Sequence, residues 1–194
     1  MAEQYAIEMR NITKTFGSVV ANSGINLAVK QGEILALLGE NGSGKTTLMN
    51  MLSGIYKPDS CSIFIDGKEV SIDSPEDSKK YGIGMVHQHF KLVEVFSAAD
   101  NIWMGQDKTG PILKKNRFKY VEDIAHKFGF DIDPKKKVYN MAVSEKQTLE
   151  IIKVLSYGAK TIILDEPTAV LTVQEIEKLF GVLRRMKEEG HAII

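Results

Sequence analysis

Residues 39–46 read GENGSGKT and match the pattern G-x-x-x-x-G-K-[S/T] at each of its fixed positions. The run before them, residues 33–38 (EILALL), is apolar and predicts a buried strand. The run after them, residues 46–54 (TTLMNMLSG), has helical spacing that ends at Gly54. A glycine-rich loop between a strand and a helix is typical of a phosphate-binding site in an α/β protein.

The residue types in this loop suit the binding of a nucleoside triphosphate. Its glycines let the backbone curl so that N–H groups face phosphate oxygens. Lys45 is expected to reach the β- and γ-phosphates, and Thr46 is expected to offer its hydroxyl to Mg²⁺. The candidate nucleotide-binding residues are Gly39, Glu40, Asn41, Gly42, Ser43, Gly44, Lys45, Thr46 and Thr47.

A second candidate element is residues 161–166, TIILDE, where an apolar run ends in two acids. Acids at the carboxyl end of a strand are common at the ligand crevices of α/β sheets. Asp165 is expected to bind nucleotide through the Mg²⁺ shell, and Glu166 to polarise a water for attack on the γ-phosphate.

The remaining segments predict a mixed α/β organisation. Residues 5–10 alternate apolar and polar, as a half-buried strand does, and residues 62–70 (SIFIDGKEV) predict a hairpin around a central Asp-Gly pair. Residues 82–88 predict another short strand, and residues 97–157 are mainly helical in pattern. This order indicates an α/β core with an inserted helical part.

Residues 172–190 predict a final helix. Thr172 and Glu175 form a capping-box pattern at its start, and Gly190 ends it. The predicted buried face consists of Ile176, Leu179, Phe180, Leu183 and Met186.

Composition narrows the possible classes of protein. The 25 Lys and Arg residues balance the 25 Asp and Glu residues, which argues against a dedicated nucleic-acid binder. Cys61 is the only cysteine, so no internal disulfide can form. No apolar run approaches the roughly 18 residues that a membrane helix needs, and the N-terminus lacks a signal-peptide pattern. The residues after Gly190 predict a strand that the end of the sequence interrupts, so we expect the chain to be a fragment.

Three stretches, in this order and spacing, resemble the ATP-binding subunit of ABC transporters: GENGSGKTT, the His-Gln pair at residues 87–88, and LDEPTAVLT at residues 164–172. The resemblance covers essentially the whole chain. It implies an α/β fold, a P-loop NTPase core with a mixed sheet, flanking helices and an N-terminal antiparallel β part. It also implies that residues 1–194 are one ABC-type ATP-binding domain, truncated at its C-terminal end, with a helical subdomain inserted at residues 90–157.

The resemblance assigns further roles in a site for ATP and Mg²⁺. Gln88 is the lid glutamine, which contacts Mg²⁺ and the attacking water, and Phe16 stacks on adenine. The catalytic candidates are then Glu166 and Gln88. The metal candidates are Thr46, Gln88 and Asp165.

Residues 141–147, MAVSEKQ, stand where the family has its Leu-Ser-Gly-Gly-Gln signature. Ala142 takes the place of the serine, Val143 and Ser144 those of the two glycines, and Gln147 lies near the glutamine. In the family, the serine hydroxyl and a glycine N–H contact the γ-phosphate bound on the opposite half. Ala142 removes that hydroxyl and Ser144 adds a side chain, so the resemblance implies a weakened signature. An ordinary capped helix without a phosphate role is the alternative.

Residues 82–102 closely resemble the subgroup that imports nucleosides or simple sugars, and His89-Phe90 favours the nucleoside branch. In that subgroup one polypeptide carries two ATP-binding halves, and the intact Lys45 marks the first half. The implied partners are membrane permease subunits, the second ATP-binding half and, indirectly, an extracytoplasmic solute-binding protein, without nucleic acid. The implied location is peripheral, on the cytoplasmic face of the cell membrane.

Two other functions stay open: a soluble ABC-type ATPase that acts on ribosomes or DNA, and a non-hydrolysing nucleotide-dependent regulator. The balanced charge and the short segment between Gln88 and Ala142 argue against the first. The second is disfavoured by the presence of all four candidate residues, Lys45, Gln88, Asp165 and Glu166. The switch histidine of the family is absent, because His191 precedes its position. We therefore expect the isolated chain to bind ATP but to be nearly inactive as an ATPase.

Overall fold

The computed structural model describes residues 5–88, 90–104 and 114–194. His89, on which the nucleoside-branch interpretation partly rests, lies outside the described residues. The chain divides into two compact units, each with a core of its own. The first comprises Met1–Met85, Lys160–Ile163 and Lys187–Ile194, and the second comprises Val86–Ala159 and Leu164–Met186.

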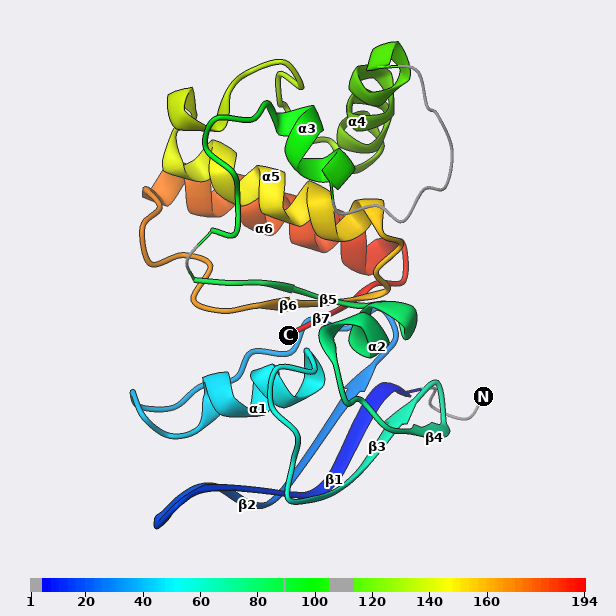
Figure 1. Cartoon of the computed structure of the whole chain (residues 1–194), viewed down its shortest axis with the longest axis vertical. Coiled ribbons are helices and arrows are strands. Elements are labelled where there is room, and N and C mark those ends of the chain that lie inside the picture. Colours follow the sequence, from blue (N-terminus) through cyan, green and yellow to red (C-terminus); the bar gives the residue numbers. More distant parts are fainter. Residues whose placement is uncertain (1–4, 89, 105–113) are drawn as a thin grey trace. The chain divides into compact units, whose positions relative to one another are not determined.

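The first unit contains an antiparallel sheet with the strand order β2-β1-β3-β4 (Figure 1). Its strands are β1 (Tyr5–Phe16), β2 (Val19–Lys30), β3 (Ser60–Ile65) and β4 (Lys68–Val70). The turn between β3 and β4 has positive φ at both central residues, 49° at Asp66 and 76° at Gly67, as a two-residue hairpin turn requires. The hairpin predicted from the sequence is confirmed.

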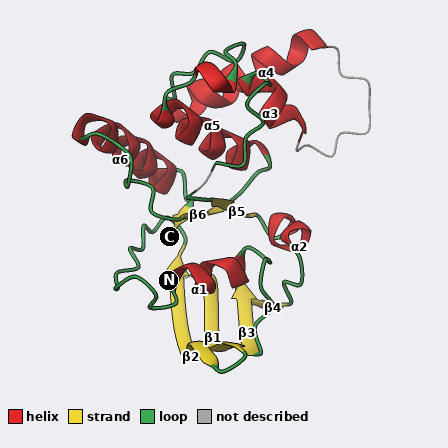
Figure 2. Cartoon of the chain, turned by 60° about the vertical axis from the view of Figure 1, so that its left-hand side comes forward, coloured by secondary structure: helices red, strands yellow, loops and turns green. Residues whose placement is uncertain are grey.

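Helix α1 (Lys45–Leu52) lies beside this sheet and shares its core (Figure 2). The predicted helix and its end at Gly54, where φ is 73°, are confirmed. The shared core is built mainly from apolar side chains of α1, β1 and β3: Ile7, Met9, Ile12, Leu48, Met49, Met51, Leu52 and Ile63. Because a fully buried side chain of this size contributes about 1.5–3 kcal/mol, α1 is held firmly where it begins with Lys45.

A second sheet has the strand order β5-β6-β7, and β6 pairs with β7 in parallel. Its strands are β5 (Ile83–Val86), β6 (Thr161–Leu164) and β7 (Ala192–Ile193), and a short helix, α2 (Pro75–Lys80), precedes β5. The strands predicted at residues 82–88 and 161–166 are therefore present. The two acids follow the carboxyl end of β6, as predicted.

The second unit is mainly helical. It contains α3 (Ala98–Met104), α4 (Lys114–Phe128), the 3₁₀ turn η1 (Val138–Asn140), α5 (Val143–Ser156) and most of α6 (Val173–Glu188). Leu149 and Ile152 of α5 are fully buried against α3 and α4, so α5 is the central helix of this core. The bounds 90–157 for an inserted helical subdomain stay a prediction. None of the helices in the described ranges combines the length and the apolar character needed to cross a membrane.

The strand predicted over residues 33–38 is wrong. Ile34 makes an isolated parallel bridge with Ile193, and Leu38 is 92% exposed. The run exchanges two backbone hydrogen bonds with Ile193, which belongs to the two-residue strand β7. The partner is too short to extend the ladder, so the rest of this run is irregular backbone that leads into the glycine-rich loop.

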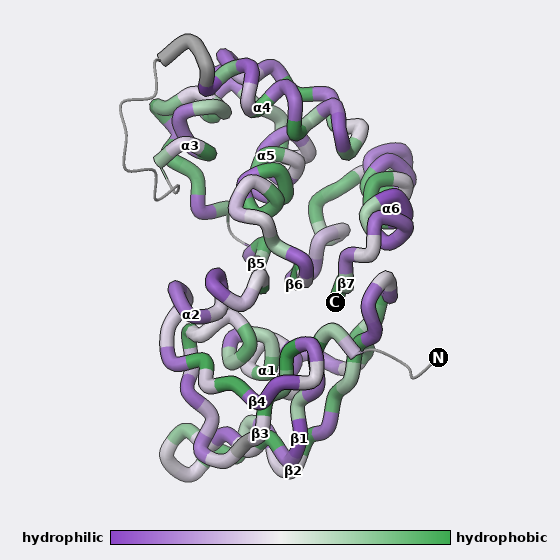
Figure 3. The backbone as a smooth tube through the Cα atoms, turned by 90° about the vertical axis from the view of Figure 1, so that its right-hand side faces the viewer, coloured by the Kyte–Doolittle hydropathy of each residue, from purple (hydrophilic) through white to green (hydrophobic). Residues whose placement is uncertain are grey.

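The predicted cap of α6 is confirmed, but its predicted buried face is only partly right, because Ile176 is half-buried and Phe180 is exposed. The Thr172 N–H donates to Glu175 Oε2 at 2.9 Å, and the Glu175 N–H donates to Thr172 Oγ1 at 3.4 Å. Phe180 is 42% exposed, whereas Val182 is buried. The buried residues Leu179, Val182, Leu183 and Met186 follow the i, i+3, i+4, i+7 spacing of one helix face, which excludes Phe180. Figure 3 shows the alternation of hydrophilic and hydrophobic residues around α6.

Candidate functional site

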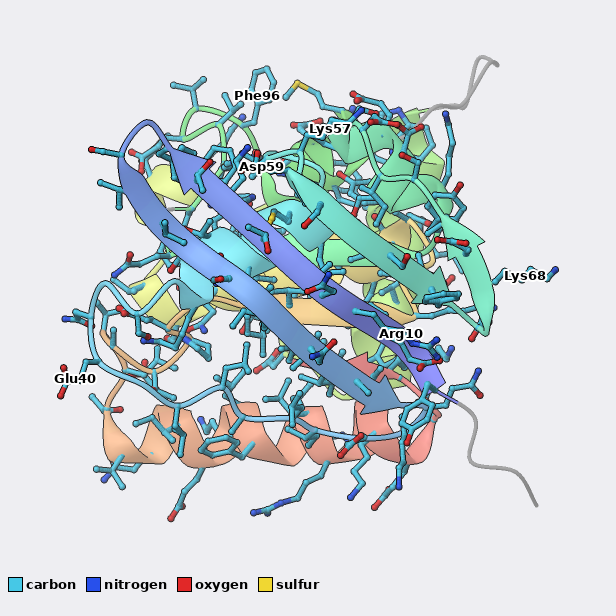
Figure 4. All side chains as sticks on the ribbon, turned by 90° about the horizontal axis from the view of Figure 1, so that it is seen from below. Arg10, Glu40, Lys57, Asp59, Lys68 and Phe96 are labelled. Atoms are coloured by element: carbon cyan, nitrogen blue, oxygen red, sulfur yellow. The ribbon has the colours of Figure 1, made fainter. Side chains whose placement is uncertain are left out.

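The glycine-rich loop of the first unit is organised around the side chain of Lys45, the first residue of α1. The Lys45 ammonium donates to the carbonyl oxygens of Gly39 at 2.7 Å and Glu40 at 2.8 Å, and contacts Ser43 Oγ at 3.4 Å. Figure 4 shows Glu40 at the outer edge of the loop, with its own side chain directed outward. The ammonium therefore lies over the loop backbone, with no carboxylate in these three contacts.

Gly44 is a position in this loop that requires glycine. Its φ is 88°, which disfavours other residues, and a Cβ there would collide with the Ala21 carbonyl oxygen and would lie 2.8 Å from Asn22 Nδ2. The buried Asn22 side chain also donates to the Gly44 carbonyl oxygen at 3.3 Å. Close packing against β2 thus fixes the backbone at the start of α1.

The start of α1 suits an anionic ligand. Its N-cap residue is Gly44, which has no side chain to cap the first N–H groups, and the first turn, Lys45 to Leu48, carries no acid. N–H groups at a helix start together with an ammonium make an attractive site for phosphate. Thr46 is exposed and Thr47 half-buried in the same turn. These residues fit a polyphosphate.

Phe16, predicted to stack on a base, is the last residue of β1, and its side chain is 43% exposed. Its ring lies edge-to-face with Tyr56, with 5.2 Å between the ring centroids. The ring is thus accessible and is supported by a second aromatic residue of the same unit. Tyr56 was not singled out from the sequence, because its contact with Phe16 depends on the folded sheet.

In the second unit, the structure brings two predicted catalytic residues together. Gln88 Nε2 donates to Glu166 Oε2 at 2.8 Å, although the residues are 78 positions apart. Glu166 directly follows Asp165, whose N–H donates to the Val86 carbonyl oxygen at 3.2 Å. Backbone pairing between the end of β5 and the segment after β6 therefore places the amide of Gln88 against the carboxylate of Glu166.

A buried charge pair on α5 fixes the loop that carries Gln88. The Lys153 ammonium donates to the Lys91 carbonyl oxygen at 2.8 Å and pairs with Glu150 at 3.3 Å. Glu150 is only 3% exposed, so loss of Lys153 would leave a buried carboxylate without this partner. Burial and then the charges of Lys91 and Lys153 lower the pKa of His87, which keeps its ring neutral near neutral pH. The Glu150–Lys153 pair was not predicted from the sequence, where only its i, i+3 spacing on a helix pointed to it.

At the start of α5, where the sequence predicts an altered signature, a carboxylate of the chain itself accepts the first hydrogen bond. Ala142 is the N-cap residue and has no side-chain acceptor, and its N–H donates to Glu145 Oε2 at 2.8 Å. The Lys136 ammonium contacts both oxygens of Glu145, at 2.7 and 2.8 Å. Burial opposes ionisation of Glu145, but the bonds from Lys136 and Ala142 outweigh it, so the pKa of this carboxyl is lowered.

The other predicted signature residues have different surroundings. Ser144 donates a hydrogen bond to Glu175, the largest of the effects that lower the pKa of the Glu175 carboxyl. Val143 is 45% exposed. Gln147 is 5% exposed, and its amide donates to the Pro167 carbonyl oxygen at 2.6 Å. Ala142 and Val143 are therefore exposed to solvent, whereas Ser144 is half-buried and Gln147 is engaged inside its unit.

Similarity to known proteins extends along nearly the whole chain. The family model described as "ABC transporter" matches residues 22–169. A guanosine import ATP-binding protein, NupO of Bacillus subtilis, is 48% identical over 193 residues, which is 98% of this chain and 38% of the relative. A nucleoside import ATP-binding protein, NupA of Lactococcus lactis, is 44% identical over 197 residues, which is 100% of this chain and 39% of the relative.

The galactose/methyl galactoside import ATP-binding protein MglA of Escherichia coli K12 is 41% identical over 98% of this chain and 38% of its own length. The chain therefore spans about two fifths of these curated relatives. Among solved structures, the ADP conformation of MJ1267, an ATP-binding cassette of an ABC transporter, has a TM-score of 0.86 at 22% identity, covering 97% of this chain and 79% of that one. CbiO1 from Clostridium perfringens has a TM-score of 0.83 at 28% identity, covering 99% and 77%. The predicted fold class is confirmed.

Proposed function

Because this chain belongs to the ABC transporter family, we propose that it binds MgATP and supplies ATP hydrolysis for the import of a nucleoside or simple sugar. The observation that carries the proposal is the loop around Lys45. It combines an ammonium, an uncapped helix start and glycine backbone in one place. These are groups by which proteins recognise phosphate.

Different residues of the chain would bind the phosphates and the base of the nucleotide. The Lys45 ammonium would leave its carbonyl contacts in part to reach phosphate oxygens, and the first N–H groups of α1 would face the same oxygens. Phe16 would stack on the base through its exposed ring. Glu40, Asn41, Gly42 and Ser43 are all exposed, so nothing in the loop itself blocks the ligand.

The side chains present also suit Mg²⁺. The first unit offers the Thr46 hydroxyl, and the second offers the Asp165 carboxylate and the Gln88 amide oxygen, which are hard oxygen ligands of the kind that Mg²⁺ prefers. The ion supplies charge neutralisation on the β- and γ-phosphates when bound.

Hydrolysis would rest on Glu166 and Gln88. The Glu166 carboxylate can take a proton from the attacking water, and the Gln88 amide, which already donates to it, holds the carboxylate in one orientation. Lys153 holds the loop after Gln88 in turn. Loss of Gln88 would therefore change the position of the base as well as remove an amide.

Transport needs partners beyond this chain. We infer membrane permease subunits, a second ATP-binding half in the same longer polypeptide, and a solute-binding protein that acts through the permease. The location would be peripheral, on the cytoplasmic face of the membrane. The import proteins among the relatives support this choice over action on ribosomes or DNA and over a non-hydrolysing regulator.

Uptake measurements test the import proposal. Cells that lack the longer protein would be complemented with the wild type or with Lys45→Ala and given labelled guanosine, uridine or galactose. Uptake of at least one of these solutes should depend on the protein and on Lys45. If uptake of all three is the same with and without the protein, import of these solutes is not its function.

The altered signature leads to a prediction about unequal ATP sites. In the longer protein, the double change Ala142→Ser with Ser144→Gly should raise ATP hydrolysis, because it restores a hydroxyl and a close backbone approach to phosphate. A missing hydrogen bond to a charged group is worth about 1.5–3 kcal/mol, or roughly a 10- to 150-fold change in one step. The gain should be smaller than this, because Glu145 and Glu175 still place negative charge at the start of α5.

Steady-state ATPase rates would be compared with those of Thr148→Ser, a control one turn further along α5. The ATPase rate that remains in Lys45→Ala gives the share of total hydrolysis that comes from the site facing the altered signature. If Lys45→Ala leaves most of the hydrolysis intact, the altered signature is competent and the inequality is disproved.

A further inference from the structure

The aromatic pair Phe16–Tyr56 is a feature that the glycine-rich loop does not explain. The two rings are 5.2 Å apart between centroids, at an interplanar angle of 73°. This edge-to-face arrangement is a favourable one for two aromatic rings. Both rings are still partly exposed, Phe16 at 43% and Tyr56 at 37%, so the pair has not simply been packed into the core.

Tyr56 is attached to the far end of the helix that starts at the loop. The N–H groups of Ile55 and Tyr56 both donate to the Asn50 carbonyl oxygen, at 2.9 and 3.2 Å. Asn50 belongs to α1, which begins at Lys45 and is eight residues long. One short helix, buried along one face, therefore connects the Lys45 end to the Tyr56 ring.

Asp59 fastens the end of β1, which carries Phe16. Its carboxylate accepts hydrogen bonds from the Thr15 N–H and the Thr15 hydroxyl, both at 2.7 Å, and from the Lys14 ammonium at 2.9 Å. The Asp59 N–H donates to the Thr13 carbonyl oxygen at 2.9 Å. Figure 4 shows Asp59 just before β3, at the end of the sheet where β1 finishes. Four bonds thus fix the three residues that precede Phe16.

Asp59 stays ionised and holds the Lys14 ammonium near the Phe16 ring. The hydrogen bonds from Lys14 and then Thr15 lower the pKa of the Asp59 carboxyl to about 2, so it stays ionised at every ordinary pH. The Lys14 ammonium, held by Asp59, lies 5.5 Å from the centroid of the Phe16 ring, within the range of a cation–π contact. Phe16 is therefore held by Tyr56, by Lys14 and by its own strand.

We propose that Tyr56 and Asp59 are positioning residues for the base of the nucleotide, because they hold the exposed ring of Phe16 in place for stacking. This inference rests on the proposed binding of ATP and goes beyond it. A ring that is already fixed loses little rotamer freedom when a base stacks on it, whereas an unsupported ring would have to be ordered on binding. The two residues should therefore strengthen the binding of a nucleotide, which has a base, but not the binding of a polyphosphate without one.

The test compares two ligands on the same chain: MgATP and magnesium tripolyphosphate, which has the phosphates but no base. Dissociation constants would be measured by calorimetry. Tyr56→Leu should weaken ATP binding about 2- to 12-fold, the range expected for loss of an aromatic pair. Tripolyphosphate binding should not change. Tyr56→Phe, which keeps the ring, should bind ATP like the wild type. Asp59→Asn should weaken ATP binding and leave tripolyphosphate binding unchanged.

Matched controls are available in the same unit. Tyr81→Leu removes a tyrosine that is 39% exposed and lies outside the Phe16 pair. Asp73→Asn removes an exposed ion pair with Lys57, 2.6 Å long, and so matches the charge change of Asp59→Asn. Neither control should alter the dissociation constant of either ligand.

The binding data can overturn the positioning role of Tyr56 and Asp59. If Tyr56→Leu weakens both ligands equally or neither, or if the controls weaken ATP as much, the positioning role is overturned. Retained tripolyphosphate binding also shows that a variant is folded. If the wild-type chain binds neither ligand, the proposed ATP binding fails along with this inference, and that result differs from a failure of the positioning role alone.

Discussion

Lys45→Ala is expected to remove detectable MgATP binding from the chain. The ammonium now donates to two carbonyl oxygens of the loop, so the substitution removes the charge that phosphate oxygens would meet and also two bonds that shape the loop. A hydrogen bond to a charged group is worth about 1.5–3 kcal/mol. Loss of contacts to two phosphates therefore weakens binding by roughly 10²-fold or more, which calorimetry would register as no binding.

Lys68→Ala is the control for this experiment. Lys68 is an exposed lysine of β4 in the same unit and has the same charge (Figure 4). It should leave ATP binding unchanged, while both variants keep the thermal unfolding midpoint of the wild type within a few degrees. ATP binding by Lys45→Ala within threefold of the wild type would remove this lysine from the phosphate site.

Glu166→Gln is expected to lower ATP hydrolysis by the longer protein about 10²- to 10⁴-fold, the usual contribution of a general base. The new amide oxygen can still accept the hydrogen bond that Gln88 donates at 2.8 Å, so the local geometry should survive. ATP binding should be retained, because the phosphate-binding groups lie elsewhere in the chain. Hydrolysis and retained labelled ATP would be measured side by side.

Glu177→Gln provides the matched control, since Glu177 is an exposed acid on α6 in the same unit as Glu166. The control should hydrolyse ATP at the wild-type rate. Equal rates for Glu166→Gln and the wild type would show that another group activates the water. Loss of ATP binding together with hydrolysis would instead assign Glu166 to the binding of nucleotide.

The sequence predicted the features that depend on neighbouring residues. The glycine-rich loop, α1, the hairpin at Asp66-Gly67 and the cap of α6 are each specified within a few positions of the chain. The strand at residues 33–38 could not be predicted correctly in the same way. Its apolar composition suits a strand, but its extent depends on a partner, β7, that lies about 160 residues away in the sequence.

In the candidate site too, the sequence predicted individual residues but not the contacts between distant segments. The apolar run that ends in two acids pointed to Glu166 and the family resemblance pointed to Gln88, but the hydrogen bond between them follows from the pairing of Asp165 with Val86 in the fold. The side chains that hold the candidate residues in place were missed, because their contacts join distant segments. Asp59, Tyr56 and Lys153 are the clearest cases, and none of them lies in a recognisable motif.

The backbone of Glu166 has φ of 49°, in the left-handed region that residues with a Cβ rarely adopt. A residue held there costs about 1–3 kcal/mol relative to glycine or an ordinary conformation. The backbone conformation of the acid proposed as the base thus works against folding, at a position where glycine would relieve the strain but could not act as a base. Selection for a robust fold and selection for turnover act in opposite directions on this residue, so a glutamate here is expected to persist only while turnover is required.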